Sequence, residues 1–236
     1  EEINQDLLKR RIILGKRNGF DGKKVVIPIQ KNNQNPDLYP DGTYQKISQL
    51  PLDQVDDLWK LPVLTDILLL DQTSKGIVMG FPAADCPVLI AFDIKQQVAS
   101  LAHCGAEYIN RELPVDLIKS LEKEANSKRN DIKVYLSSCA GKDYYYNQFP
   151  SWATNNFVWK DHIQKNGQYY YIDLRGSIID LLARYHIFSS QLIINHQDTI
   201  TDPLLYSNNA TYRKIPNKNG RYLVGCFYEE EKKKVK

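Results

Sequence analysis

The sequence has few cysteines and no long hydrophobic run. Its four cysteines form no Cys-x-x-Cys pair within 236 residues. This sparse spacing argues against a disulfide-stapled scaffold and is typical of reduced thiols. The longest apolar runs are about as long as a strand, far below the roughly 18 residues of a membrane span. No basic segment followed by an apolar one opens the chain, so we expect a soluble, cytoplasmic protein without a membrane partner.

The chain also has little excess charge. It carries 31 basic and 28 acidic residues, a formal net charge of +3, and the lysines are scattered through stretches rich in Asn and Gln. Proteins that bind nucleic acid usually concentrate positive charge on one face or segment. We therefore expect a small-molecule substrate and no nucleic acid.

The remaining composition is that of an ordinary globular protein, with 42% hydrophobic and 25% charged residues. Strand-like and helix-like segments alternate without an internal repeat or a linker. This predicts a single α+β (α/β) domain over residues 1–236, with 1–20 and 229–236 peripheral or frayed. The predicted helices are 114–128 and 175–185. The predicted strands are 24–29, 66–70, 76–80, 86–92, 97–102, 132–136, 191–195 and 222–228.

Cys86 and His103 stand at the two ends of a predicted hairpin. The apolar run that follows Cys86 indicates a strand buried on both faces, and residues 97–102 run back toward His103. A thiol beside an imidazole can be a nucleophile with its base, or two ligands of a zinc ion. A buried small cysteine and a structural histidine are the alternative, because free cysteine is among the most buried residue types.

The segments around these two residues resemble the laccase-domain (YfiH-type) family. Residues 84–91, Ala-Asp-Cys-Pro-Val-Leu-Ile-Ala, are similar to the family's Thr-Ala-Asp-Cys-(x)-Pro-Val-Leu strand. Residues 102–105, Ala-His-Cys-Gly, are similar to its Ala-His-Ala-Gly segment. Weaker similarity follows at 172–174, where an Asp-Leu opens a helix, and at 198–221. The resemblance spans roughly residues 24–228.

This resemblance implies mixed β-sheets flanked by helices, as in the catalytic domain of cytotoxic necrotizing factor, a cysteine hydrolase. It also implies a site in which one Cys and two His hold zinc or, by some accounts, copper. Activities in the family include purine nucleoside phosphorolysis, adenosine deamination, polyphenol oxidation and amide hydrolysis, so the fold does not fix the substrate. We assign catalysis and metal ligation to Cys86 and His103, and substrate binding to Arg213 and Arg221.

Several positions depart from the family pattern. Asn32 stands where the family has its third metal ligand, a histidine, and an amide oxygen is a poor zinc ligand. We therefore expect weak zinc binding or none, and copper less than zinc. Glu107 stands where the family has an arginine, which would repel a phosphate. Asp198 occupies the place of a later cysteine, and residues 137–140 replace a Gly-Pro-Ala loop.

Three functions remain open from the sequence. The first is a divergent enzyme that acts on purine nucleosides by phosphorolysis or deamination. The second is a metal-free hydrolase or amidase, with Cys86 as nucleophile and His103 as base. The third is a degenerate, non-catalytic protein that binds a ligand, or a protein partner through the aromatic segment from Tyr144 to Trp159. That segment can equally be a loop packed on the sheet.

Overall fold

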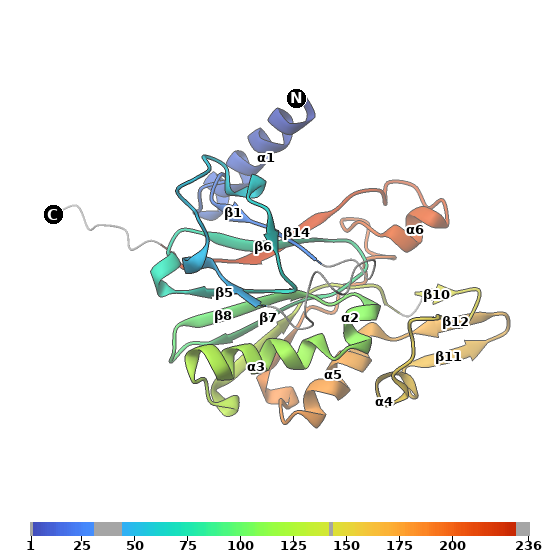
Figure 1. Ribbon diagram of the computed structural model, residues 1–236. Helices are drawn as coiled ribbons and strands as arrows, with labels where there is room; N and C mark the ends of the chain where they lie inside the picture. Colours follow the sequence, from blue (N-terminus) through green and yellow to red (C-terminus); the bar gives the residue numbers. More distant parts are fainter. Residues whose placement is uncertain (1, 31–43, 142–143, 230–236) are drawn as a thin grey trace. The chain divides into compact units, whose positions relative to one another are not determined.

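The computed structural model describes residues 2–30, 44–141 and 144–229 (Figure 1). The chain divides into two compact units. The first unit comprises residues 1–80 and 225–236, and the second comprises residues 81–224. Two strands cross the boundary between the units, β6 (Val78–Ala83) and β14 (Tyr222–Cys226).

Short parallel strand pairs form the framework of the first unit. β1 pairs with β6, β2 with β4, and β3 with β5, all in parallel. The buried side chains are mostly β-branched or leucine, which suit a pleated surface covered on both faces. The strands of this unit, apart from β6 and β14, are β1 (Val25–Val26), β2 (Pro28–Ile29), β3 (Tyr44–Lys46), β4 (Val63–Leu64) and β5 (Ile67–Asp71). Its 3-10 helices are η2 (Ile47–Gln49), η3 (Leu58–Lys60) and η4 (Gln72–Ser74).

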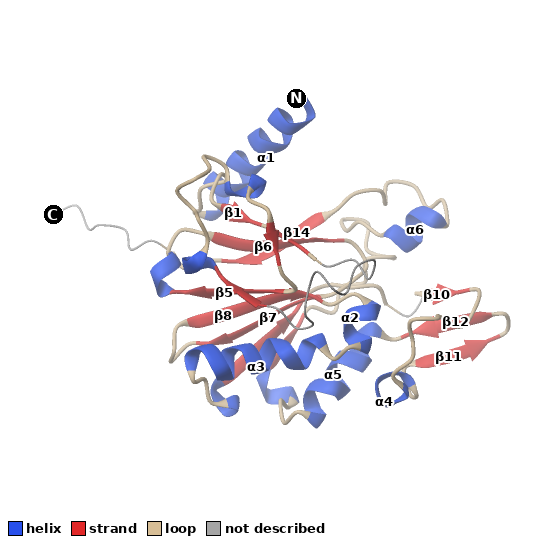
Figure 2. Cartoon of the chain, viewed as in Figure 1, coloured by secondary structure: helices blue, strands red, loops and turns tan. Residues whose placement is uncertain are grey.

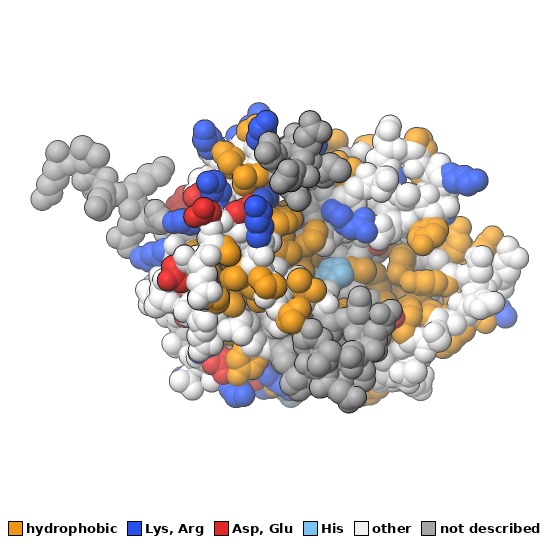
Figure 3. All heavy atoms as spheres, turned by 45° about the horizontal axis from the view of Figure 1, so that its top comes forward, with side chains coloured by type: hydrophobic (Ala, Val, Ile, Leu, Met, Phe, Trp, Pro, Cys, Tyr) orange, Lys and Arg blue, Asp and Glu red, His pale blue; other side chains and the backbone are white. Residues whose placement is uncertain are grey.

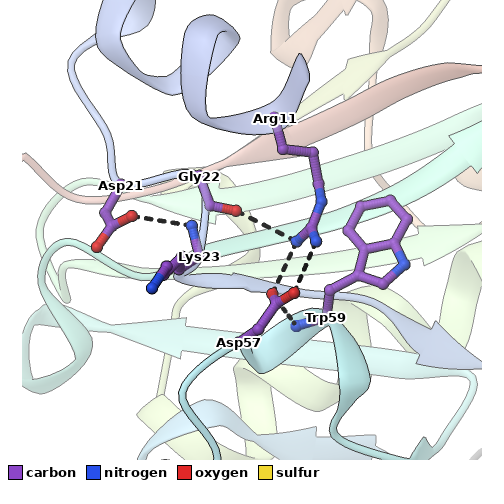
Figure 4. A network of polar contacts seen from close by, with 6 residues as sticks. All are labelled: Arg11, Asp21, Gly22, Lys23, Asp57 and Trp59. Atoms are coloured by element: carbon purple, nitrogen blue, oxygen red, sulfur yellow. Dashed lines mark hydrogen bonds and ion pairs between the residues drawn. The ribbon is translucent and has the colours of Figure 1, made fainter. Parts of the chain in front are cut away.

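Helix α1 (Glu2–Asn18) is anchored in the first unit by a buried arginine. Arg11 donates two hydrogen bonds to the carboxylate of Asp57, at 2.9 and 2.8 Å, and a third to the Gly22 carbonyl at 3.2 Å (Figure 4). Its guanidinium carbon lies 4.5 Å from the centre of the Trp59 ring, within cation–π range. The prediction of a peripheral or frayed segment 1–20 missed this anchor, because a charged side chain makes it instead of an apolar stripe.

The second unit is built on four strands in the order β13-β9-β7-β8. β7 is antiparallel to both β8 and β9, and β9 is parallel to β13. β7 lies between two partners and is buried along almost its whole length, which explains why its sequence is apolar on both faces. These strands are β7 (Val88–Asp93), β8 (Val98–His103), β9 (Ile132–Leu136) and β13 (Leu192–Ile194).

Helices cover this sheet in the second unit. α3 (Leu113–Ala125) packs against β7 and β8 with its apolar side, and α5 (Leu174–Arg184) packs against α3 (Figure 1). Asp173 caps α5 by accepting a hydrogen bond from the Gly176 N–H at 2.8 Å. The remaining helices are α2 (Ala106–Asn110), α4 (Asn156–Trp159), α6 (Asn208–Tyr212), η5 (Arg129–Asp131) and η6 (Ser189–Gln191).

A second, smaller sheet in this unit has the order β10-β12-β11 (Figure 2). It consists of β10 (Tyr145–Tyr146), β11 (Ile163–Asn166) and β12 (Tyr169–Ile172). Asn166 pairs with Tyr169 across a two-residue turn whose first residue, Gly167, has φ +60°. A glycine at that place is typical of a type II′ hairpin turn. The segment from Tyr144 to Trp159 contains β10 and α4, and its two end residues are buried, in agreement with the alternative that it packs on the rest of the unit.

The predicted fold class, mixed β-sheets with flanking helices, is confirmed. Most predicted elements are present within one to four residues of their predicted limits, and β9 has the predicted limits. The sequence prediction missed α1, β3, β4, the short helices α2, α4 and α6, and the sheet β10-β12-β11. Its prediction of a single laccase-like domain over residues 1–236 stays a prediction, because one family domain can contain two compact units.

Candidate functional site

The hairpin β7–β8 brings Cys86 and His103 together in the second unit. His103 pairs with Val88 in the strand register, and Cys86 stands two residues before Val88. Gly105 lies between the two functional side chains. A methyl group on Gly105 would be 3.4 Å from Cys86 Sγ and 3.8 Å from His103 Cε1. Both atoms therefore lie within 4 Å of one point, which any larger side chain at Gly105 would occupy.

The backbone around Gly105 holds this arrangement in place. Gly105 caps the short helix α2, and the backbone N–H of Ala106 donates a hydrogen bond to Cys86 Sγ. On the other side, Cys104 N–H donates to the Pro87 carbonyl at 2.8 Å. The Phe81 ring lies 5.9 Å from the His103 ring, centre to centre, and packs against it. Cys104 itself is fully buried.

Burial keeps both functional groups uncharged at neutral pH. The pKa of Cys86 rises from 9.0 to about 12, first through burial and then through the nearby charges of Asp85 and Cys139. Arg221 and the Ala106 N–H act in the opposite direction on this pKa. The pKa of His103 falls from 6.5 to about 4 through burial and the positive charge of Arg221. At pH 7 the site therefore contains a thiol and a neutral imidazole, not a thiolate–imidazolium pair.

The structure brings one of the two predicted arginines to the site. Arg221 is exposed, and its charge acts on both Cys86 and His103. Arg213 is also exposed, and its guanidinium carbon lies 5.1 Å from the centre of the Tyr145 ring. Arg221 is thus placed to influence a ligand at Cys86, whereas the Arg213 guanidinium lies over a ring of the smaller sheet.

Asp85, directly before Cys86, fixes the C-terminal loops of the second unit. Its two carboxylate oxygens accept hydrogen bonds from the Thr199 hydroxyl at 2.9 Å and from the Asn209 N–H at 2.7 Å. The ammonium group of Lys218 is buried and donates to three backbone carbonyls, of Thr199, Asp202 and Leu205. The Cys86 strand and the loops before Arg221 are therefore joined through Thr199.

Two further groups hold residues 137–141 in place by hydrogen bonds. Tyr222 donates its hydroxyl to the Ser138 carbonyl at 2.9 Å. Asp198 accepts hydrogen bonds from the N–H groups of Gly141 and Ile200, at 3.0 and 2.9 Å, so it acts as a loop anchor. The sequence analysis gave no role to Lys218 or Tyr222. The Asp-Cys motif could have singled out Asp85, because a carboxylate beside a buried cysteine needs partners.

The described residues supply two metal donors at this site. Asn32, the predicted third ligand, lies outside the described residues. Across residues 2–30, 44–141 and 144–229, no group of three or more His, Cys, Asp or Glu side chains could hold a metal ion. Catalytic zinc sites normally take three protein ligands. The described donor set thus does not by itself fit a zinc ion, and no reaction step is derived through a metal.

None of the helices in the described ranges has both the length and the apolarity that a membrane crossing requires.

Comparisons with known proteins identify the family. The family model of the multi-copper polyphenol oxidoreductase laccases matches residues 54–227. The chain therefore belongs to this laccase family, as its motifs predicted.

Three solved structures are similar to the fold. The hypothetical protein YfiH of Bacillus licheniformis has a TM-score of 0.74 at 15% identity, over 95% of this chain and 82% of that chain. YlmD from Geobacillus stearothermophilus has a TM-score of 0.75 at 15% identity, over 96% and 81%. A Neisseria meningitidis protein of family model DUF152 has a TM-score of 0.65 at 12% identity, over 93% and 80%. At such identities the likeness concerns the fold alone, and no curated protein sequence matches the chain.

Proposed function

We propose that this laccase-family chain is an enzyme that acts on a purine nucleoside at Cys86, His103 and Arg221. The observation that carries the proposal is that Cys86 Sγ and His103 Cε1 both lie near Gly105. They are 3.4 and 3.8 Å from the position that a β-carbon on Gly105 would take. The charge of the exposed Arg221 acts on both of these groups. The substrate class comes from the resemblance to the family.

The site residues have complementary chemical roles. The neutral His103 imidazole accepts a hydrogen bond and so orients an attacking water or a substrate hydroxyl. The protonated Cys86 thiol is a weak donor beside it. The positive charge of Arg221 favours negative charge that develops on the substrate in the transition state.

We further propose that the reaction uses water, as in deamination, in preference to phosphate. Glu107 is exposed in the first turn of α2, two residues after Gly105. An anion a few ångströms from a phosphate costs on the order of 1–4 kcal/mol at intermediate dielectric. A neutral water molecule meets no such repulsion, so hydrolytic chemistry tolerates Glu107 better than phosphorolysis does.

The test is turnover of adenosine and inosine with and without phosphate. We expect adenosine deamination that does not depend on phosphate and that falls by about 100-fold or more in His103→Ala. Cys226→Ala is the matched control for Cys86→Ala, because it removes a thiol from the first unit. Equal turnover in Cys86→Ala and wild type would remove Cys86 from the mechanism. The absence of turnover for every purine nucleoside would overturn the proposal.

The metal-free cysteine hydrolase is less well supported than the nucleoside enzyme. Its nucleophile would have to be a thiolate, and the pKa of Cys86 is raised to about 12. Protein binding through the segment from Tyr144 to Trp159 has one specific observation in its favour. Phe149 and Phe157 are 54% and 55% exposed, and hydrophobic side chains gather over this part of the second unit (right side of Figure 3). Binding of a partner there is compatible with catalysis at Cys86.

A further inference from the structure

A pair of tyrosine hydroxyls lies beside the Cys86 site. Main-chain hydrogen bonds place their segment there: Ala140 N–H donates to the Asp85 carbonyl at 2.8 Å, and Tyr144 N–H donates to the Gly141 carbonyl at 3.1 Å. Ala140, four residues before Tyr144, is therefore bonded to the residue next to Cys86.

The electrostatics of the two hydroxyls agrees with this placement. Burial raises the pKa of Tyr144 and of Tyr146, and the negative charge of Asp85 raises both further. Both phenol groups therefore lie near enough to Asp85 for its charge to act on them.

The two hydroxyls are hydrogen-bonded to each other. Tyr144 Oη lies 2.7 Å from Tyr146 Oη, and the rings meet edge to face at 5.5 Å. The Trp152 ring meets the Tyr146 ring edge to face, with 6.1 Å between the ring centres. Tyr144 is only 8% exposed, whereas Tyr146 is half-buried.

The number of hydroxyl protons shows that the tyrosine pair has one hydrogen-bond donor left for a ligand. Two hydroxyls bring two protons, and the bond between them uses one. One O–H donor therefore remains. With Tyr144 donating to Tyr146, this donor is on the more accessible Tyr146 and is strengthened by the bond that Tyr146 accepts.

We propose that the Tyr144–Tyr146 hydroxyl pair binds substrate at the Cys86 site by donating its remaining O–H to a ring nitrogen of the purine. This inference rests on the proposed function for the identity of the ligand. The site then recognises a substrate that presents an acceptor to the tyrosines.

Binding of adenosine and of its 1-, 3- and 7-deaza analogues tests the pair. Each analogue replaces one ring nitrogen by C–H and so removes one acceptor. We expect wild type to bind one analogue about three- to tenfold more weakly than adenosine, the usual effect of one hydrogen bond. Tyr146→Phe should reduce that ratio to about one. Tyr169→Phe is the matched control, since Tyr169 stacks on Tyr145 in the same sheet and should leave the ratio unchanged.

A pair that only holds β10 in place would give a different result. Tyr146→Phe would then weaken all four ligands by one factor and keep their ratios, which would overturn the proposal. Equal binding of adenosine and all three analogues by wild type would overturn it as well.

Failure of wild type to bind any nucleoside would refute the proposed function, and a second measurement then decides the donor role of the pair. The rate of Cys86 alkylation by iodoacetamide, whose carbonyl accepts a hydrogen bond, is compared with that by allyl bromide, which has no acceptor. We expect the iodoacetamide-to-allyl-bromide ratio to fall about three- to tenfold in Tyr146→Phe and to stay constant in Tyr169→Phe. An unchanged ratio in Tyr146→Phe would exclude a donor at this site.

Discussion

At neutral pH we expect the Cys86 thiol to be nearly inert toward alkylation. Burial, followed by the charges of Asp85 and Cys139, raises the pKa of Cys86 from 9.0 to about 12. The thiolate is the reacting species, so a thiol with a pKa of about 12 reacts about 1000-fold more slowly at pH 7 than one at 9.0. The rate should rise about tenfold for each pH unit and approach a plateau only near the pKa of about 12.

The assay is timed labelling with iodoacetamide, followed by mass spectrometry of the Cys86 peptide. The same peptide in urea-unfolded protein supplies the rate of an unburied thiol. Arg221→Gln should slow the reaction of the folded protein about three- to tenfold more, because Arg221 lowers the pKa of Cys86. Arg213→Gln is the matched control, as the Arg213 guanidinium lies over the Tyr145 ring.

A different pH profile would refute this reasoning. A rate that is already at its plateau near neutral pH would mean that Cys86 is a thiolate in the folded protein. The burial argument would then be wrong, and the metal-free hydrolase with Cys86 as nucleophile would become the leading function. An unchanged rate in Arg221→Gln would remove Arg221 from the site.

Four other outcomes are expected. Folding lowers the pKa of His103 from 6.5 to about 4. Its contribution to the free energy of unfolding, up to about 3 kcal/mol, is therefore present above pH 6.5 and is lost as the pH falls toward 4. Denaturant unfolding at several pH values should show a free energy that depends less on pH in His103→Gln than in wild type. Elemental analysis of purified protein should find substoichiometric zinc or none, and Asn32→His should raise the affinity for zinc if Asn32 is the third-ligand position. Full, chelator-resistant zinc occupancy in wild type would contradict the alignment of Asn32 with the family's histidine. Arg11→Met should lower the free energy of unfolding by about 3–5 kcal/mol, because it leaves the Asp57 carboxylate buried without its cation. The double variant Arg11→Met/Asp57→Leu should recover part of this loss, and a mild effect of Arg11→Met alone would argue against a buried ion pair. Glu107→Arg should raise the affinity for phosphate by a factor of about 10 to 1000 in a direct titration. An unchanged affinity would mean that Glu107 is too far from the phosphate to repel it.

Local patterns sufficed for the elements that make the Cys86 hairpin. The apolar run 88–92 is buried on both faces because β7 has a partner strand on each side, and such runs have no polar alternation. The Asp93 carboxylate accepts the N–H groups of Lys95 and Gln96 and so fixes the turn, which returns the chain at the expected place. The two-residue turn Gly167-Gln168 is an equally local hairpin signal, since glycine at the first turn position is typical of a type II′ turn.

By itself, the sequence determined the fold class, the family motifs and the proximity of Cys86 to His103, since each depends on neighbouring residues or on one short hairpin. The tertiary structure alone decided the charge state of the site, because burial is a property of the whole unit and moves the two pKa values away from neutrality in opposite directions. It also decided which distant groups surround Cys86. Asp85 accepts a hydrogen bond from Thr199, which is 114 residues away in the sequence. Arg221 acts on the Cys86 thiol because loops bring it near, and no local sequence pattern encodes the path of these loops.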